Sequence, residues 1–222
     1  MADVNDQIET LPLLQRLALT YAAQNARVET LGLMVLDNRL AGIVSRSTEP
    51  MLAQIRLAWW REQLTQNPHE WPKGEPLLAL LRHWEGRAAE LVMLVNGWEC
   101  AVSNGTPLSP EDIQQLAEAR GAAFGLLAEG LGHSDKANAT SQMARAWALA
   151  DQATHLKEAH DRETARGLLA DVTWERQRLP RALRPVAVLN GLAARSSRRG
   201  TGLDQLDALS IIPAMRIGLL GR

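Results

Sequence analysis

Apolar residues recur at helical spacing through almost the whole chain, and this periodicity constrains the fold more than any other feature. Leu14, Leu17 and Tyr21 fall on one helical face, and residues 27–46 carry apolar side chains over a wide arc. No segment alternates cleanly between apolar and polar residues beside an Asn-Gly or Asp-Gly turn, as a β-hairpin would require. We therefore predict an all-α chain with almost no sheet.

Capping and proline signals predict where the helices begin and end. Residues 109–112 (SPED) form the strongest helix start, because they supply a hydroxyl cap, a first-turn proline and two carboxylates at the positive end of the helix dipole. That helix should continue to about residue 131. The other helices are expected at residues 10–21, 27–46, 50–66, 76–98, 138–160, 164–169, 180–195 and 203–219, with a loop at 67–76 and a polar linker at 196–202.

Length and charge set the broad class of protein. A chain of 222 residues with 46% apolar residues is expected to form a single domain, residues 1–222. The formal net charge of −1 gives no general reason to bind nucleic acid. The N-terminus has neither the cationic region nor the apolar run of a secretory signal, and no apolar run approaches a membrane span. We expect a cytoplasmic protein with at most peripheral membrane contact.

Two local features leave alternatives open. The arginine-rich stretch 162–222 indicates either a solvated basic face or a contact for lipid headgroups or an acidic partner. Trp59 and Trp60 are adjacent on a helix that also carries Leu52 and Ile55, so the two indoles point about 100° apart. They are expected to pack against two neighbouring helices; the alternative is that they form the wall of a ligand pocket.

The runs 33–44 (LMVLDNRLAGIV) and 49–61 (EPMLAQIRLAWWR) resemble the squalene/phytoene synthase family, and the RLAWWR string is the most specific part. The resemblance covers most of the chain and weakens over the last forty or so residues. It implies an isoprenoid-synthase-like helical bundle around a central cavity, shortened at the C-terminus. In the family's enzymes, two Asp-rich helices face each other and hold Mg²⁺ against the diphosphates of two prenyl substrates, because the ions neutralise the leaving group.

The sequence departs from the family at both motifs. The first, Asp-Asp-x-x-Asp in the enzymes, falls on residues 41–45 (AGIVS), which hold no carboxylate, although Asp37 lies one turn earlier on the face of Ala41. The second falls on Asp151, His155 and Ala159, of which only Asp151 suits magnesium. The resemblance therefore implies Asp37, Ala41, Ser45, Asp151 and His155 as candidate substrate-binding residues, and no catalytic residue.

A row of polar side chains on the helix predicted at 138–160 has its own alternatives. Asp151, His155 and Glu158 follow i, i+4, i+7 spacing, which places them on one helical face. The row indicates a solvated or hydrogen-bonded stripe, a relict diphosphate-facing surface, or a transition-metal site. The last needs ligands from elsewhere, and His83, His133 and His160 show no matching spacing.

Two functional hypotheses follow. In the first, the chain is a pseudoenzyme similar to the branch of the family that includes a mitochondrial complex I assembly factor. It would act in binding or assembly without a cofactor, with a prenyl diphosphate, a lipid chain or an unidentified protein as its partner. In the second, it is a transferase of isoprenoid biosynthesis acting on prenyl diphosphates, with Asp37, Asp151 and Glu158 as rearranged Mg²⁺ ligands. Electrostatics favour the first, because a leaving group of about three negative charges needs several compensating charges.

Overall fold

The computed structural model describes residues 4–84, 86–174, 177–205 and 215–218. All regular secondary structure within these ranges is helical, which confirms the predicted all-α class for the described part of the chain. Among these helices, none combines the length and the apolar character needed to cross a membrane.

The longer helices are α3 (Arg27–Arg46), α4 (Pro50–Thr65), α7 (Pro110–Gly130), α8 (Ala137–His155) and α10 (Arg184–Arg199). Shorter helices complete the bundle: α1 (Val4–Glu9), α2 (Leu13–Leu19), α5 (Pro76–Leu81), α6 (Val92–Cys100) and α9 (Ala159–Ala170). Single 3-10 turns occur at Gln24–Ala26, Arg82–Trp84, Ala88–Leu91, Ser134–Lys136 and Arg181–Leu183.

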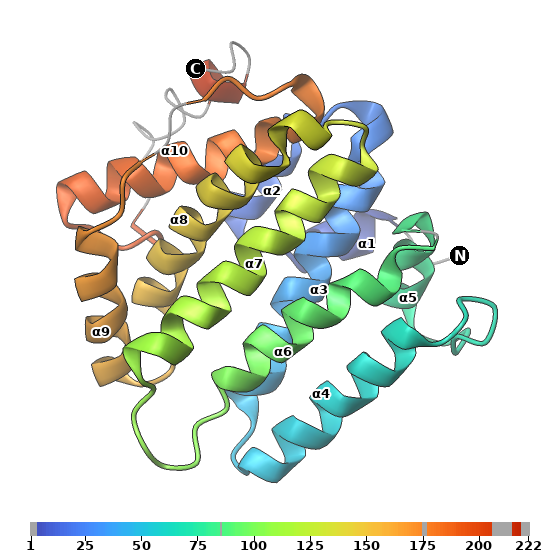
Figure 1. The fold of residues 1–222 in the computed structure, drawn as a ribbon, viewed down its shortest axis with the longest axis horizontal. Helices are drawn as coiled ribbons and strands as arrows, with labels where there is room; N and C mark the ends of the chain where they lie inside the picture. The colour runs from blue at the N-terminus through green and yellow to red at the C-terminus, as the bar shows by residue number, and fades with distance from the viewer. Residues whose placement is uncertain (1–3, 85, 175–176, 206–214, 219–222) are drawn as a thin grey trace.

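The helices α6, α7 and α8 lie side by side across the molecule, with α3 packed against α6 and α7 (Figure 1). Helix α10 crosses one end and packs on α8 and α2, while α4 lies at an edge against α6 and α3 (Figure 1). Leu31, Leu36 and Leu40 of α3 are fully buried, as expected for a helix with a wide apolar arc near the centre of a bundle.

Helices with strong local signals have nearly the predicted boundaries. Ser109 caps α7 by accepting a hydrogen bond from the backbone N–H of Asp112, and the Asp112 carboxylate accepts the backbone N–H of Ser109 in return. This reciprocal capping box satisfies two backbone donors that would otherwise lack partners. Helices α3 and α4 likewise end within one residue of the prediction.

The predicted helix from Pro76 to Trp98 is wrong as a continuous element. Helix α5 ends at Leu81, and α6 begins only at Val92. Gly86 adopts a left-handed φ of 71°, which a helix does not accommodate. The apolar residues on either side remain at core positions, so periodicity alone did not reveal the break.

The predicted helix at 138–160 is also wrong at its C-terminal end, because α8 stops at His155 and α9 starts at Ala159. Arg162 Nη1 donates hydrogen bonds to the carbonyls of Leu156 and Lys157, at 2.6 and 2.8 Å. These carbonyls therefore have partners outside a helix. Glu158 does not continue the face of Asp151 and His155, so the predicted row of three is wrong, and the piece predicted at 164–169 is part of the twelve-residue α9.

The C-terminal boundaries differ as well. Helix α10 continues through Arg199 and is capped by Gly200, whose φ of 64° is left-handed, so residues 196–199 of the predicted linker 196–202 are helical. Leu203 and Asp204 lie in a turn and do not begin the predicted helix, while 215–218 are helical. The rest of the helix predicted at 203–219 lies outside the described residues.

Helix α4 carries apolar residues on two opposite faces. Its inner face buries Ala53, Leu57, Trp60 and Leu64, as expected of a bundle helix. Its outer face exposes Met51, Leu52, Ile55 and Trp59, with exposed fractions of 68%, 43%, 59% and 37%. Trp60 packs in the core, while Trp59 lies at the surface. The two indoles contact each other edge to face.

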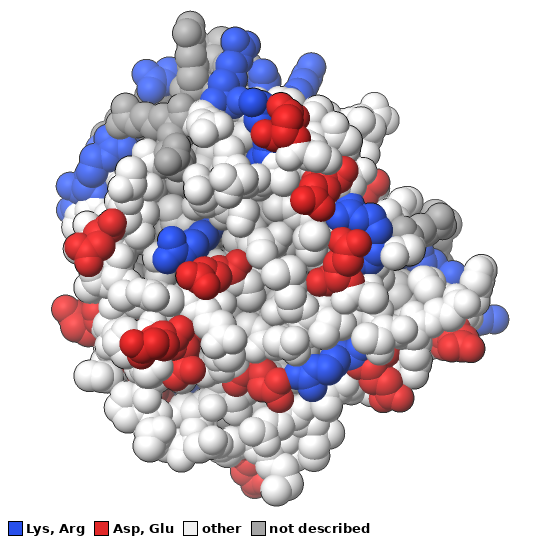
Figure 2. Space-filling model, in the orientation of Figure 1, with Lys and Arg blue, Asp and Glu red and all other residues white. Residues whose placement is uncertain are grey.

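The surface charges of both signs are interspersed over the middle of the face in Figure 2. Lys and Arg side chains gather along its upper left edge, where Figure 1 places α10 and the C-terminal part of the chain. This edge of the molecule is therefore basic.

Candidate functional site

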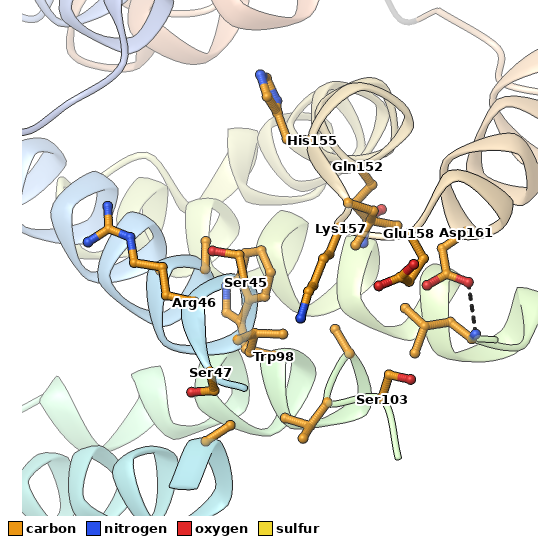
Figure 3. A pocket seen from close by; sticks show the side chains of 18 of the residues that line it. Ser45, Arg46, Ser47, Trp98, Ser103, Gln152, His155, Lys157, Glu158 and Asp161 are labelled. Atoms are coloured by element: carbon orange, nitrogen blue, oxygen red, sulfur yellow. Dashed lines mark hydrogen bonds between the residues drawn. The ribbon is translucent and has the colours of Figure 1, made fainter. Parts of the chain in front are cut away.

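A cavity of about 640 Å³ lies between the C-terminal halves of α3 and α8, the start of α4 and the end of α6. The loop that follows α6, the turn between α8 and α9 and the first turn of α9 complete its wall. Figure 3 shows polar side chains from these segments around one space. The cavity therefore joins parts of the chain that lie more than 100 residues apart.

The structure brings four of the five candidate substrate-binding residues to this cavity: Ala41, Ser45, Asp151 and His155. Glu158 lines it too, from the turn before α9. Asp37 does not line it and is 3% exposed. Ala41 and Gly42 add only small side chains to the wall, and a Cβ atom at Gly42 would meet no other group within 4 Å.

A buried ion-pair network lies behind the cavity and contains Asp37. Arg120 lies in the middle of α7 and is 2% exposed. Its Nε donates to both carboxylate oxygens of Asp37 at 3.1 Å, and its Nη2 donates to Oδ2 at 2.8 Å. Arg120 Nη2 also lies 2.8 Å from Asp151 Oδ2. One guanidinium therefore bridges two of the three residues that the transferase hypothesis names as magnesium ligands.

Two tryptophans enclose this guanidinium. Its central carbon lies 5.3 Å from the ring centroid of Trp98 and 4.6 Å from that of Trp147, within the range of cation–π attraction. Trp98 Nε1 donates to Asp37 Oδ1 at 2.8 Å. Trp98 also lines the cavity, as Asp151 does, so two residues of the network contribute to the cavity wall.

The electrostatics of the network follow from these contacts. Burial disfavours the charged form of Asp151, but Arg120 and His155 outweigh it and lower the pKa of Asp151 to about 2. Burial likewise opposes the charge on Arg120, and the two aspartates outweigh it, so the pKa of Arg120 is raised. The hydrogen bond between His155 Nδ1 and the accepting Asp151 Oδ1, at 3.0 Å, raises the pKa of His155.

A second polar group lines the cavity at the start of α9. Asp161 is 3% exposed and accepts a hydrogen bond from the backbone N–H of Leu108, at 3.0 Å (Figure 3). Glu158 forms no ion pair with any residue that the structure describes, and its side chain accepts no capping bond from α9. Gln152 donates through Nε2 to the carbonyl of Ile113, while its Oε1 is buried without a partner among the described residues.

Sequence reasoning missed Arg120, Trp98 and Asp161 as members of the site. A signal for Arg120 existed: it follows Ile113, Leu116 and Ala117 on the apolar face of α7, where an unpaired arginine is rare. The identity of its partners was not readable, because Asp37 lies 83 residues away in the sequence.

The donor set does not fit magnesium. Asp37 and Asp151 are both bound to Arg120, and Glu158 lies on a separate segment from Asp151. Within the described part of the chain, no group of three or more His, Cys, Asp or Glu is placed to hold a metal ion. Octahedral Mg²⁺ needs oxygen ligands that are free to coordinate it, which a carboxylate held by guanidinium is not.

Comparison with known proteins adds no further assignment. No protein-family model matches the sequence, and neither the curated proteins nor the solved structures give a match.

Proposed function

We propose that this protein is a non-catalytic, squalene/phytoene synthase-like member of the isoprenoid-synthase fold that holds an apolar chain in its cavity. The observation that carries the proposal is the Asp37–Arg120–Asp151 network beside an open cavity. Where a prenyl transferase needs carboxylates free for metal ions, this chain has already neutralised them with its own arginine.

The walls of the cavity support an apolar ligand. Trp98, Leu108 and Val44 are apolar lining residues, and Ala41 and Ala53 add small apolar side chains to the same wall. A volume of about 640 Å³ lies within the few hundred to one thousand Å³ of pockets that bind small molecules. Burial of each methylene group of a chain would contribute about 0.8 kcal/mol, so a chain of modest length can bind without a metal-held headgroup.

Two experiments test the proposal. The first measures pyrophosphate release from labelled farnesyl or geranylgeranyl diphosphate in the presence of Mg²⁺, and no turnover is expected. Turnover that is abolished by both Asp37→Asn and Asp151→Asn would overturn the proposal in favour of a transferase with rearranged ligands.

The second experiment measures binding of an uncharged prenyl alcohol, farnesol, by calorimetry. Ala41→Phe should fill the cavity and abolish binding, because Ala41 lines it. Ala58→Phe is the matched control, since Ala58 is exposed on α4 and lies outside the cavity. Farnesol binding that survives Ala41→Phe, or no binding by the unmodified protein, contradicts the proposal.

The exposed outer face of α4 favours an assembly role as a second candidate. Four of its large apolar residues stand in one stripe, and such a patch is characteristic of a contact surface. Ile55→Gln would weaken a contact at this face and leave farnesol binding unchanged. A pull-down measures the contact, and the same calorimetric titration measures farnesol binding.

A further inference from the structure

Three hydrogen-bond acceptors gather at one end of the cavity: Gln152 Oε1 and the carboxylates of Glu158 and Asp161 (Figure 3). Gln152 is 2% exposed, and its Oε1 has no partner within the part of the chain that the structure describes. An unpaired buried acceptor costs about 1–3 kcal/mol, so a ligand group that donates to it recovers that cost.

The two carboxylates are also left without a cation. No ion pair is formed by Asp161 or Glu158 among the described residues. Asp161 uses one oxygen for the backbone N–H of Leu108. Neither side chain accepts a hydrogen bond from the first turn of α9, so helix capping does not explain them.

The chemistry of these acceptors indicates the ligand group. A primary ammonium has three N–H donors and no acceptor, which matches two carboxylates and one amide oxygen. The apolar wall formed by Trp98, Leu108 and Val44 lines the same cavity. We propose that Gln152, Glu158 and Asp161 bind the primary ammonium of an aliphatic amine, whose chain lies along that wall. This inference rests on the proposed function and names the headgroup that the cavity selects.

The positive charge of Lys157 distinguishes a ligand ammonium from a ligand carboxylate. Its ammonium also lines the cavity, but it extends away from Glu158 and Asp161 and forms no ion pair with any described residue (Figure 3). A ligand ammonium is repelled by Lys157 and attracted by Glu158. A ligand carboxylate would experience the opposite forces.

The experiment titrates the protein with decylamine, decan-1-ol and decanoate at pH 7 by isothermal titration calorimetry, below the aggregation concentration of each. Decylamine is expected to bind about tenfold more tightly than decan-1-ol, with one molecule per chain, since hydrogen bonds to charged groups are the stronger ones. Glu158→Gln should weaken decylamine binding about threefold to tenfold and leave decan-1-ol unchanged. Lys157→Met should strengthen decylamine binding.

Glu163→Gln is the matched control for loss of one negative charge. Glu163 is on α9 too, but it is exposed, pairs with Arg166 and does not line the cavity. It should leave decylamine binding unchanged; an equal loss in Glu163→Gln and Glu158→Gln would mean general attraction to an acidic surface and would overturn the inference.

The remaining outcomes separate the inference from the function on which it rests. If decan-1-ol binds as tightly as decylamine, or decanoate binds most tightly, the ammonium site is wrong and the apolar cavity stands. If none of the three compounds binds, both proposals fail. A stronger affinity for decylamine in Glu158→Gln, or a weaker one in Lys157→Met, also contradicts the ammonium site.

Discussion

Asp37 and Asp161 are equally buried, each 3% exposed. Asp37 is paired with a cation, Arg120, whereas Asp161 has no cationic partner among the described residues. Asp37 accepts three hydrogen bonds from Arg120 and one from Trp98, so every charge in that network has a partner. Asp161 has a single backbone donor, beside the unpaired Oε1 of Gln152. A closed polar network stabilises the fold, whereas an open one beside a cavity leaves acceptors for a ligand.

Arg120→Met should produce the largest effect on stability. It leaves the buried Asp37 without its cation, and breaking a buried pair by removing one partner costs about 3–5 kcal/mol. Urea denaturation monitored by circular dichroism measures the loss. The double variant Arg120→Met with Asp37→Asn should recover much of it, because no unpaired charge remains; a loss under about 1 kcal/mol in the single variant would refute the network's structural role.

Trp98→Phe should cost less, about 1–2 kcal/mol, because it removes the N–H donated to Asp37 and weakens the cation–π contact with Arg120. The free energy of unfolding in urea reports this value. Trp59→Phe is the control, since Trp59 is partly exposed and contacts neither residue, and it should change stability by less than about 0.5 kcal/mol.

Asp161→Asn should be milder still, below about 1 kcal/mol, since the amide keeps an acceptor for the Leu108 N–H and leaves no cation unpaired. Asp37→Asn, at the same burial, should cost more because it weakens three charge-assisted hydrogen bonds. If the two substitutions proved equally costly in the same urea titration, the distinction between a closed and an open group would be lost.

The pH dependence of stability should show the smallest effect, at His155. Its folded pKa is raised by Asp151, so its contribution is complete below about pH 6.5 and is lost as pH rises through the raised value. Asp151 has the opposite sign: with a folded pKa of about 2, its contribution is present above about pH 4 and is lost as pH falls toward 2.

His155→Gln separates these two contributions. Measured as free energy of unfolding against pH, the variant should lose the decline above about pH 6.5 and keep most of the decline below about pH 4. An unchanged profile above pH 6.5 would show that the His155–Asp151 contact does not contribute to stability in solution.

Helices with their own start and stop signals were predictable from the sequence, and breaks without such signals were not. The SPED start of α7 and the wide apolar arc of α3 placed both helices nearly where the structure has them. The interruption at Gly86 and the turn at 156–158 were missed, because their apolar neighbours continue the helical period across each break. That second miss also merged Glu158 with the wrong helix.

For the candidate site, the sequence supplied residue types and a resemblance, and four of the five proposed binding residues line one cavity. Their role in binding stays a prediction. Asp37 shows the limit, since its separation from the cavity depends on how α3 packs against α7.

The sequence alone determined that the chain is helical, since capping and periodicity act between residues a few positions apart. It also determined that carboxylates are absent from residues 41–45. Only the tertiary structure decided which charges are neutralised, because Arg120 is 83 residues from Asp37 and 31 from Asp151. Such pairing depends on which helices pack together, and no local preference encodes it.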